Sequence, residues 1–295
     1  MNANEREVMM TANHSATAGL EQKRHGLYGR LRSIGRLMVA YSGGTDSAYL
    51  AYAAHEVLGN EMLAVIADSP SLARADLKSA IDFAASCAIP LRIIPTNELA
   101  DPDYVRNEAD RCFHCKDELF RAMATIEEFS SVAYGMNLDD IADFRPGQKA
   151  AQQHKVYAPL AEAGLTKSEI RQLAREAGLS VWDRPAAACL SSRIAYGLPV
   201  TQETLQRIES GESLLSSIGF RQFRVRHHGE MVRIEIARSE MERLFSLAVF
   251  DELSAAFKRL GYKFVTLDLE GFRSGSMNSL LPASAIGTVT QTTAR

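Results

Sequence analysis

A loop rich in glycine and hydroxyl residues, SGGTDS at positions 42–47, joins a short apolar run to a long helical stretch. Two consecutive glycines let the backbone approach a ligand closely, because neither carries a side chain. The helix that follows offers unpaired N–H groups and the positive end of its dipole to an anion. The loop therefore predicts a strand-to-helix junction that holds phosphate groups at the edge of a sheet.

The same loop also identifies a class of nucleotide site. The expected nucleotide contacts are Ser42, Gly43, Gly44, Asp46 and Ser47, and Asp46 is expected to help hold a metal ion on the phosphates. The alternative is a tight turn in which the aspartate caps the next helix. The loop has neither the Gly-Lys-Ser/Thr ending of a Walker A motif nor the GxGxxG spacing. It resembles the SGGxDS loop of the PP-loop ATP pyrophosphatases, which adenylate a substrate and release pyrophosphate.

Short apolar runs and amphipathic stretches alternate from the loop to about residue 185. The expected strands are Arg36–Tyr41, Met62–Ala67, Leu91–Pro95 and Ser131–Tyr134, and the expected helices are Asp46–Leu58, Ser71–Cys87, Lys116–Glu128 and Lys167–Ala177. This alternation is typical of a parallel sheet with helices on both faces. We therefore expect an α/β fold for this part of the chain.

The pattern changes after Pro185. A helix at Gln202–Ser217 precedes strands at Phe220–His227 and Met231–Ala237, and a helix at Glu240–Leu260 precedes a strand at Lys263–Leu269. This order predicts a smaller α+β domain. The expected organisation is a flexible tail at 1–20, a nucleotide domain at 21–185, a second domain at 186–282 and a flexible tail at 283–295.

Composition excludes several classes of function. The chain has 295 residues with 46% hydrophobic residues and a net charge of −3, so no global basic field attracts nucleic acid. Its longest apolar run, Ala48–Ala54, has seven residues, against the ~20 that cross a bilayer. Only 4 cysteines and no signal peptide argue against a disulfide scaffold. We expect a soluble cytoplasmic protein without nucleic-acid or membrane partners; a homo-oligomer is compatible with the sequence.

Polar side chains follow two further strands of the expected sheet. Asp68 and Ser69 end the second strand, and a Gly135, Asn137, Asp140 segment ends the fourth, with Asp139 beside it. Ligands of such folds bind at the carboxyl ends of the strands. We expect these residues to complete the nucleotide site, the alternative for residues 137–140 being an Asx turn that caps the next helix.

Three of the four cysteines form a candidate ligand set. Cys112 and Cys115 make a C-x-x-C flanked by Arg111 and Lys116 before a helix, a setting that lowers thiol pKa. Cys189 follows small residues, whereas Cys87 lies in an apolar helix and is expected to be inert. Three thiols suit a [4Fe–4S] cluster with one open iron. A zinc site completed by His114 or a distant ligand, and a buried inert Cys189, are the alternatives.

These segments together resemble the LarE sulfur transferases from about Leu37 to Asn278. The resemblance rests on AYSGGTDSAYL (40–50), ADSPSL (67–72), RCFHCK (111–116), YGMNLDD with DFRPG (134–147), LTKSEIRQLAREAGL (165–179), DRPAAACLSSRIAYG (183–197), FRVR (223–226), VRIEI (232–236) and LDLEGFRSGSMN (267–278). The CLSSRI and GFRSGSMN segments are the most specific of these.

The resemblance implies an enzyme of nickel-pincer nucleotide biosynthesis. Its members use ATP and Mg²⁺ to adenylate a carboxylate of pyridinium-3,5-biscarboxylic acid mononucleotide, a small-molecule substrate, and then insert sulfur twice per product. Cys189 stands where the family keeps its sulfur-handling cysteine, which is sacrificed in one branch and joins an iron–sulfur cluster in the other. Cys112 and Cys115 place this chain with the cluster branch, by resemblance.

Charged residues after Cys189 supply candidate substrate contacts. Arg193, Arg224 and Arg226 are expected to bind the substrate phosphate, since guanidinium groups match oxyanion geometry. Arg224 and Arg226 share one strand face, and the alternative is a solvated face. Glu212 and Glu235 are expected to be surface carboxylates unless the fold brings them to the sulfur site. His227 and His228 are a weak metal pair, because adjacent strand residues point to opposite faces.

Two other functions remain open at the level of sequence. Another PP-loop adenylating enzyme, such as a tRNA thiolase or an amide-forming synthetase, would share the loop. The first would need a broad basic surface, of which only the run RQFRVRHH at 221–228 is present. A non-catalytic nucleotide-binding regulator would keep the fold without turnover. ATP consumption with the carboxylated pyridinium nucleotide separates these functions.

Overall fold

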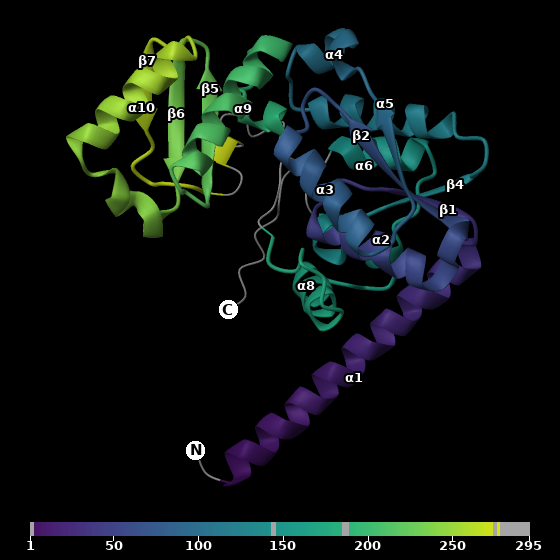
Figure 1. Ribbon diagram of the computed structural model, residues 1–295. Helices are drawn as coiled ribbons and strands as arrows, with labels where there is room; N and C mark the ends of the chain where they lie inside the picture. Colours follow the sequence, from purple (N-terminus) through teal and green to yellow (C-terminus); the bar gives the residue numbers. More distant parts are fainter. Residues whose placement is uncertain (1–2, 143–145, 185–188, 274–275, 278–295) are drawn as a thin grey trace.

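Four parallel strands in the order β3-β2-β1-β4 form the larger of two sheets (Figure 1). The computed structural model describes residues 3–142, 146–184, 189–273 and 276–277, with side chains from Ala18 onward. The strands are β1 Leu37–Ala40, β2 Met62–Asp68, β3 Leu91–Pro95, β4 Ser131–Tyr134, β5 Phe223–His228, β6 Met231–Ile236 and β7 Phe264–Leu267. The expected α/β class is therefore confirmed.

Helices cover both faces of this sheet. They are α1 Ala3–Ile34, α2 Thr45–Leu58, α3 Arg74–Ser86, α4 Pro102–Val105, α5 Arg111–Ala124, α6 Pro146–Gln153, α7 Pro159–Glu162 and α8 Lys167–Glu176, followed later by α9 Gln202–Ser217 and α10 Leu247–Arg259. Successive residues of β1 point to opposite faces. Leu37 and Val39 join the core beneath α1, α2, α3 and α8, whereas Met38 joins the core beneath α5 and α6.

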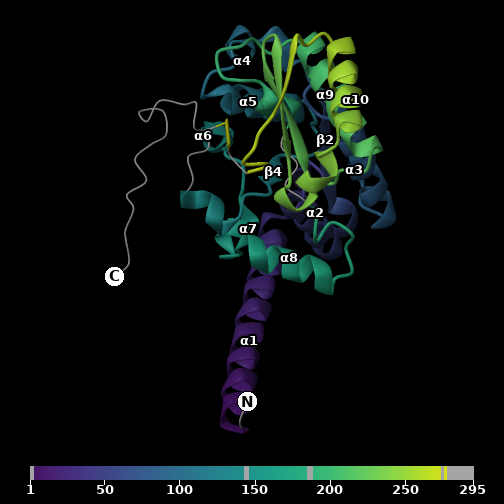
Figure 2. The ribbon, with the colours of Figure 1, turned by 90° about the vertical axis from the view of Figure 1, so that its left-hand side faces the viewer.

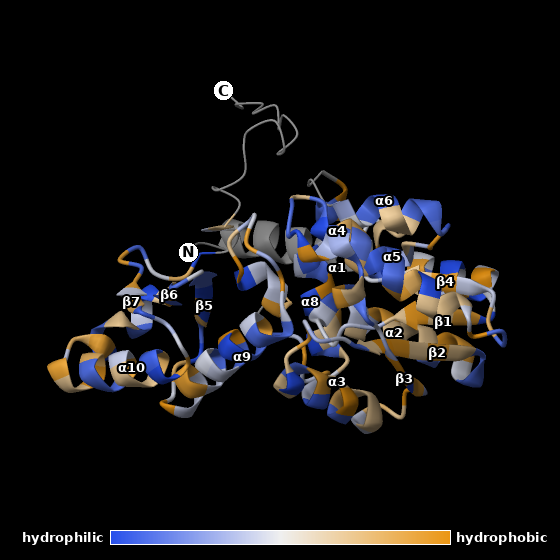
Figure 3. Ribbon diagram, turned by 90° about the horizontal axis from the view of Figure 1, so that it is seen from above, coloured by the Kyte–Doolittle hydropathy of each residue, from blue (hydrophilic) through white to orange (hydrophobic). Residues whose placement is uncertain are grey.

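The second sheet is small and mixed, in the order β5-β6-β7. β5 pairs antiparallel with β6, and β6 pairs parallel with β7. One face packs through Val225, Val232 and Ile234 against α9 and α10. The opposite face carries the charged side chains Arg224 and Glu235, which sit directly across the two strands. Figure 3 colours much of β1, β2 and α2 orange, which marks the hydrophobic residues of the larger half.

Helix α1 differs from the irregular tail that we expected at residues 1–20. It begins at Ala3 and projects away from the sheet in both Figure 1 and Figure 2. No proline occurs before residue 70 and the first glycine is Gly19, so nothing in the sequence breaks a helix here. The polarity that resembled a loose tail is equally typical of a helix surrounded by water.

The expected helix at residues 240–260 is divided in two. A 3₁₀ segment covers Arg238–Leu244, and α10 begins only at Leu247. The hydroxyl of Ser246 accepts a hydrogen bond from Val249 N at 3.2 Å, which caps the new helix. A serine that competes for backbone N–H groups favours such a start over the interior of a helix. The tail expected at 283–295 lies outside the described residues, as do residues 185–188 at the expected domain boundary.

Within the described ranges, no helix combines the length and hydrophobicity that a transmembrane span requires. A close contact at one end of the larger sheet brings the segment after β4 against the start of α2. A Cβ built on Gly135 would lie 2.7 Å from Ser47 N and 2.9 Å from Ser47 Cα. Only glycine allows this approach.

We expect Gly135→Ala to destabilise the fold by about 1–3 kcal/mol, because the added methyl meets backbone atoms that cannot rotate away. Gly29→Ala is the matched control, since a Cβ at Gly29 meets nothing within 4 Å. That change should stabilise helix α1 by about 0.5–1 kcal/mol. Urea unfolding measures both effects, and equal stabilities for the two variants would contradict the steric argument.

Candidate functional site

The SGGTDS loop connects β1 to α2 and is organised by its own hydroxyl groups. Ser47 Oγ accepts a hydrogen bond from Ser42 N at 3.2 Å and donates to Gly44 O at 3.1 Å. Gly43 has φ +75°, and a Cβ there would lie 2.7 Å from Ala80 Cβ. The positive φ angle and the short distance to Ala80 each favour glycine at position 43, and the short distance arises because the loop packs closely against α3. The loop therefore presents backbone N–H groups rather than side chains at the start of α2.

Asp46 is not the helix cap that the alternative interpretation required. The N-cap of α2 is Gly44, and Asp46 lies inside the first turn. Its Oδ2 accepts a hydrogen bond from Asn137 Nδ2 at 3.3 Å, whereas its buried Oδ1 has no hydrogen-bond partner among the described residues. Burial is the largest cause of a raised pKa for Asp46, and the Asp140 carboxylate adds to the shift while Lys167 opposes it.

Asn137 and Asp140 form the Asx-type turn that we had considered, and they also face the loop. Asp140 N donates to Asn137 Oδ1 at 3.2 Å, and Asn137 N donates to Asp140 Oδ2 at 3.3 Å. The two interpretations are thus compatible. The turn brings the Asp140 carboxylate close enough to raise the pKa of Asp46. Together with Asp46 Oδ1, which has no hydrogen-bond partner among the described residues, it forms a set of oxygen donors of the kind that Mg²⁺ prefers.

The residues at the end of β2 have other partners in the structure. Asp68 forms an exposed ion pair with Arg74. The buried Ser69 hydroxyl hydrogen-bonds to the Glu98 carboxylate, which also accepts from Ser71 Oγ at 2.9 Å. Glu98 is 2% exposed and follows β3. Sequence analysis missed Glu98, because an acid after a short strand gives no signal of burial.

Two segments far apart in the chain meet beside this hydroxyl cluster. Leu190 N donates to Ser71 O at 2.8 Å, which ties the turn after Cys189 to the β2 end of the sheet. The hydroxyl groups of Tyr104 and Ser191 are 2.5 Å apart, and both are buried. Tyr104 belongs to the hydrophobic core of the second half, although it precedes α5 in the chain.

Asn107 completes the contact between these segments. It is fully buried, and its Nδ2 donates to Ala195 O and Leu198 O, both at 2.9 Å. Arg111 donates to Asn107 Oδ1 and, at 3.0 Å, to Ser191 O. Because α5 begins at Arg111, this network places the first turn of α5 beside the Cys189 turn.

The three candidate thiols therefore share one electrostatic environment. Desolvation raises the pKa of both Cys112 and Cys115, and the neighbouring Cys189 adds to each shift. The prediction of a lowered thiol pKa is wrong for both residues. Arg111 does lower the pKa of Cys112, but burial among protein atoms outweighs it even though part of Cys112 remains exposed. The physical reason is that a thiolate loses hydration here.

The thiols do not converge as the ligands of one metal ion would. Among the described residues, the donor atoms of a single compact His/Cys/Asp/Glu group, Asp101, Asp103 and His114, lie within 4.8 Å of one another. His114 Nδ1 lies 3.2 Å from Asp101 Oδ2, so His114 faces carboxylates. Cys87 packs partly buried against the main core, which agrees with an inert role.

Two ion pairs lie near Arg224 on the polar face of the smaller sheet: Arg226–Glu235 is buried, and Arg193–Glu212, in which Glu212 belongs to α9, is partly buried. Arg226 donates through Nε and Nη2 to Glu235 Oε2 at 3.0 and 2.9 Å, and Glu235 is 0% exposed. Arg193 Nε donates to Glu212 Oε1 at 3.0 Å, while Arg193 Nη1 donates to Cys189 O at 3.0 Å. The expectation that Glu212 and Glu235 are surface carboxylates is therefore wrong.

Arg224 completes this cluster of charges. Its guanidinium lies 4.9 Å from the centroid of the Phe272 ring and donates to Phe223 O at 2.6 Å. Desolvation and the nearby Arg193 and Arg226 lower the pKa of Arg224 to about 10, so it remains cationic at neutral pH. The alternative interpretation of Arg224 and Arg226 as part of a solvated strand face is wrong, because these arginines are buried or half-buried.

The adjacent histidines point to opposite faces, as expected. His227 Nδ1 lies 3.2 Å from Tyr262 Oη in the apolar core. His228 lies on the other face, where Arg233 and Arg226 help burial to lower its pKa. Because the two imidazole rings lie on opposite faces of the sheet, they cannot bind one metal ion together. Arg184, which contacts the SGGTDS loop, is a further polar residue that sequence analysis missed.

We expect Glu235→Ala to destabilise the protein by about 3–5 kcal/mol, because it leaves Arg226 buried without its carboxylate. The matched control is Glu252→Ala on α10, an exposed carboxylate whose removal should change stability by no more than about 0.5 kcal/mol. Chemical denaturation of both variants measures the difference. A loss below about 1 kcal/mol for Glu235→Ala would show that the pair is solvated in solution.

Comparison with known proteins places this arrangement in a family. No family model matches the chain. The chain is 39% identical over 265 residues to an uncharacterised protein of Synechocystis sp., covering 89% of this chain and 99% of that protein. It is 27% identical over 242 residues to an uncharacterised protein of Methanocaldococcus jannaschii, covering 81% and 91%.

A third relative has an assigned activity. The pyridinium-3,5-bisthiocarboxylic acid mononucleotide synthase of Lactiplantibacillus plantarum is 32% identical over 276 residues, which cover 92% of this chain and 99% of the synthase. The alignment thus includes the loop, both cysteine segments and the charged face of the smaller sheet. At this identity over nearly the full length, the chain belongs to the LarE family of PP-loop proteins.

Proposed function

We propose that the protein is an ATP-dependent sulfur transferase acting on pyridinium-3,5-biscarboxylic acid mononucleotide. It would adenylate each carboxylate and replace one oxygen with sulfur to give the bisthiocarboxylic acid mononucleotide. The observation that carries this proposal is the contact of two segments with one sheet edge. Arg184 donates to Gly43 O at 3.1 Å, and Leu190 N donates to Ser71 O at 2.8 Å, so the chain on both sides of Cys189 is attached near the loop.

The first step is adenylation. A carboxylate oxygen of the substrate attacks the α-phosphorus of ATP, the bond to the β-phosphate oxygen breaks, and pyrophosphate leaves with the bonding electrons. The N–H groups at the start of α2 stabilise the charge that accumulates on the leaving group. Mg²⁺, when bound, would neutralise phosphate charge, and Asp46 and Asp140 are the residues that would hold it.

The second step is sulfur transfer. Sulfur at the level of hydrosulfide or thiolate adds to the carbonyl carbon of the acyl adenylate, and AMP departs with the oxygen that formerly belonged to the carboxylate. A [4Fe–4S] cluster held by Cys112, Cys115 and Cys189 would supply a bound sulfide for this attack. The three thiols fit such a group by their chemistry, although among the described residues their sulfur atoms do not form a compact set within 4.8 Å of one another. We also propose a cytoplasmic location, where reducing conditions would keep these thiols free.

The charged face of the smaller sheet is proposed to hold the substrate phosphate. Arg193 and Arg226 are committed to Glu212 and Glu235, and Arg224 adds a third cation beside these two carboxylates. A dianionic phosphate that approaches Arg224 meets net positive charge and a guanidinium of suitable geometry. We propose the two domains, divided near residue 185, as the adenylating unit and the substrate unit.

We expect Asp46→Asn to abolish pyrophosphate release from ATP while raising the melting temperature of the unliganded protein by about 2 °C. Burial raises the pKa of Asp46, so its ionised form opposes folding, and this cost appears as pH rises through the raised pKa. The amide removes that cost together with a metal ligand. Exposed Asp82→Asn is the control. Wild-type pyrophosphate release by Asp46→Asn would contradict the assignment.

The source of the sulfur separates the cluster from a sacrificial Cys189. We expect anaerobic reconstitution with iron and sulfide to give an iron–sulfur absorbance that Cys112→Ser loses and Cys87→Ser retains. Added sulfide should then support several sulfur transfers per chain with an unchanged protein mass. One transfer per chain, with loss of H₂S from Cys189 by intact mass spectrometry, would establish the sacrificial route instead.

A further inference from the structure

The SGGTDS loop leaves one electrostatic requirement unmet by its own residues. The pyrophosphate group carries several negative charges, and the loop contains an aspartate but no lysine. In a Walker A loop a lysine reaches the phosphates directly. Backbone N–H groups supply only partial positive charge. A full cation at this loop must therefore come from another part of the chain.

Arg184 is the cation that the fold brings to the loop. Its Nη1 donates to Gly43 O at 3.1 Å, and it would lie 3.8 Å from a Cβ on Gly43. Its Nη2 donates to Asp76 Oδ1 on α3, also at 3.1 Å. The Arg184 side chain is 20% exposed, so the guanidinium is fixed between two partners while one side remains accessible.

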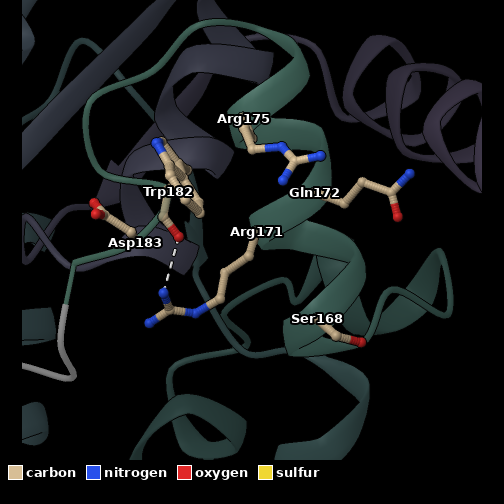
Figure 4. Close-up of a pocket in the computed structure, with 6 residues that line it drawn as sticks. All are labelled: Ser168, Arg171, Gln172, Arg175, Trp182 and Asp183. Carbon is tan, nitrogen blue, oxygen red and sulfur yellow. Dashed lines mark hydrogen bonds between the residues drawn. The ribbon is translucent and has the colours of Figure 1, made fainter.

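Helix α8 determines where Arg184 lies. Arg171 donates through Nη1 to Trp182 O at 2.8 Å and through Nη2 to Arg184 O at 2.6 Å. Figure 4 shows the first of these bonds, with Arg171 reaching from α8 toward the segment that precedes Arg184. The positive charges of Lys167 and Arg171 also act on Asp46. The cations near the loop, Lys167, Arg171 and Arg184, thus all belong to the part of the chain that follows β4.

We propose that Arg184 binds the pyrophosphate portion of the nucleotide at the SGGTDS loop, in place of the lysine of other phosphate loops. The inference deepens the proposed function, because it assumes that this loop is a nucleotide site. Arg184 then exchanges its bond to the Gly43 carbonyl for bonds to phosphate oxygens. A charge-assisted bond to an oxyanion is stronger than one to a neutral carbonyl, so the exchange is favourable.

Asp76 restrains this guanidinium in the unliganded protein. Its carboxylate competes with an incoming phosphate for the same Nη2 group. Removing the carboxylate charge should therefore strengthen phosphate binding, whereas removing the guanidinium should weaken it. A purely structural ion pair predicts the same loss of stability from both changes and no opposite effects on binding.

The test is calorimetric titration of the full chain with inorganic pyrophosphate and with Mg·ATP, which requires no turnover. Arg184→Ala should weaken pyrophosphate binding by about tenfold or more, and Arg184→Lys should restore part of it. Asp76→Asn should strengthen binding by about threefold. Arg175→Ala is the control. Arg175 also lies on α8, and its guanidinium carbon is 5.7 Å from the centroid of the Trp182 ring rather than at the loop.

The outcomes distinguish this inference from the proposed function. Unchanged pyrophosphate affinity in a folded Arg184→Ala protein overturns the inference alone, provided that the wild type binds. A wild type that binds neither probe overturns both. If Arg184→Ala fails to fold, Asp76→Asn decides: stronger binding supports the role of Arg184, and unchanged or weaker binding contradicts it.

Discussion

The buried amide of Asn107 holds together the segments on which the rest of the site depends. Its nitrogen donates to two carbonyls of the chain after Cys189, and its oxygen accepts from Arg111. Asn107 also has φ +57°, a conformation that asparagine tolerates better than most residues. Every polar atom of this side chain is thus used inside the protein. An apolar residue here would leave several buried carbonyl and guanidinium groups unpaired.

This contact explains how the two cysteine-bearing segments are connected without a continuous motif. Arg111 begins α5, so its bond to Ser191 O orients the helix turn that carries Cys112 and Cys115. On the other side, Leu190 N is held by Ser71 at the end of the larger sheet. Three hydrogen-bonded connections therefore surround the thiols: Asn107 to the chain after Cys189, Arg111 to Ser191, and Leu190 to Ser71. Desolvation by the surrounding protein raises the pKa values of Cys112 and Cys115, although Arg111 opposes the shift at Cys112.

Charge is distributed differently at the two ends of the site. At the loop, Asp46 is buried with an unpaired oxygen, and cations stand nearby on α8 and at Arg184. On the smaller sheet, buried arginines are balanced by Glu212 and Glu235. A buried charge is tolerated only when it is paired or can bind a ligand. The first end thus keeps a buried carboxylate oxygen without a hydrogen-bond partner among the described residues, whereas the carboxylates of the second end are paired with arginines.

Sequence patterns predicted the regular elements where local signals agreed with one another. The strands at 91–95 and 131–134 and the helix at 202–217 have the expected bounds. The apolar periodicity of residues 240–260 predicted one continuous helix, but the Ser246 hydroxyl caps a new helix that begins at Leu247. Sequence patterns also failed for α1, whose polar composition allows either a tail or an exposed helix. The LarE relationship and the SGGTDS loop could be recognised from the sequence because both rest on contiguous segments.

The sequence by itself determined the alternating α/β pattern, the glycine loop between β1 and α2, and the set of cysteines. The first two features depend on residues within a few positions of one another, and the third is a list of residue types that needs no knowledge of their neighbours in space. Only the tertiary structure decided that the buried Glu235 and the partly buried Glu212 pair with arginines, that Glu98 accepts hydrogen bonds from hydroxyl groups, and that Arg184 reaches Gly43. Each of these joins residues distant in the chain, and burial, pKa and pairing are properties of neighbours that only packing assembles.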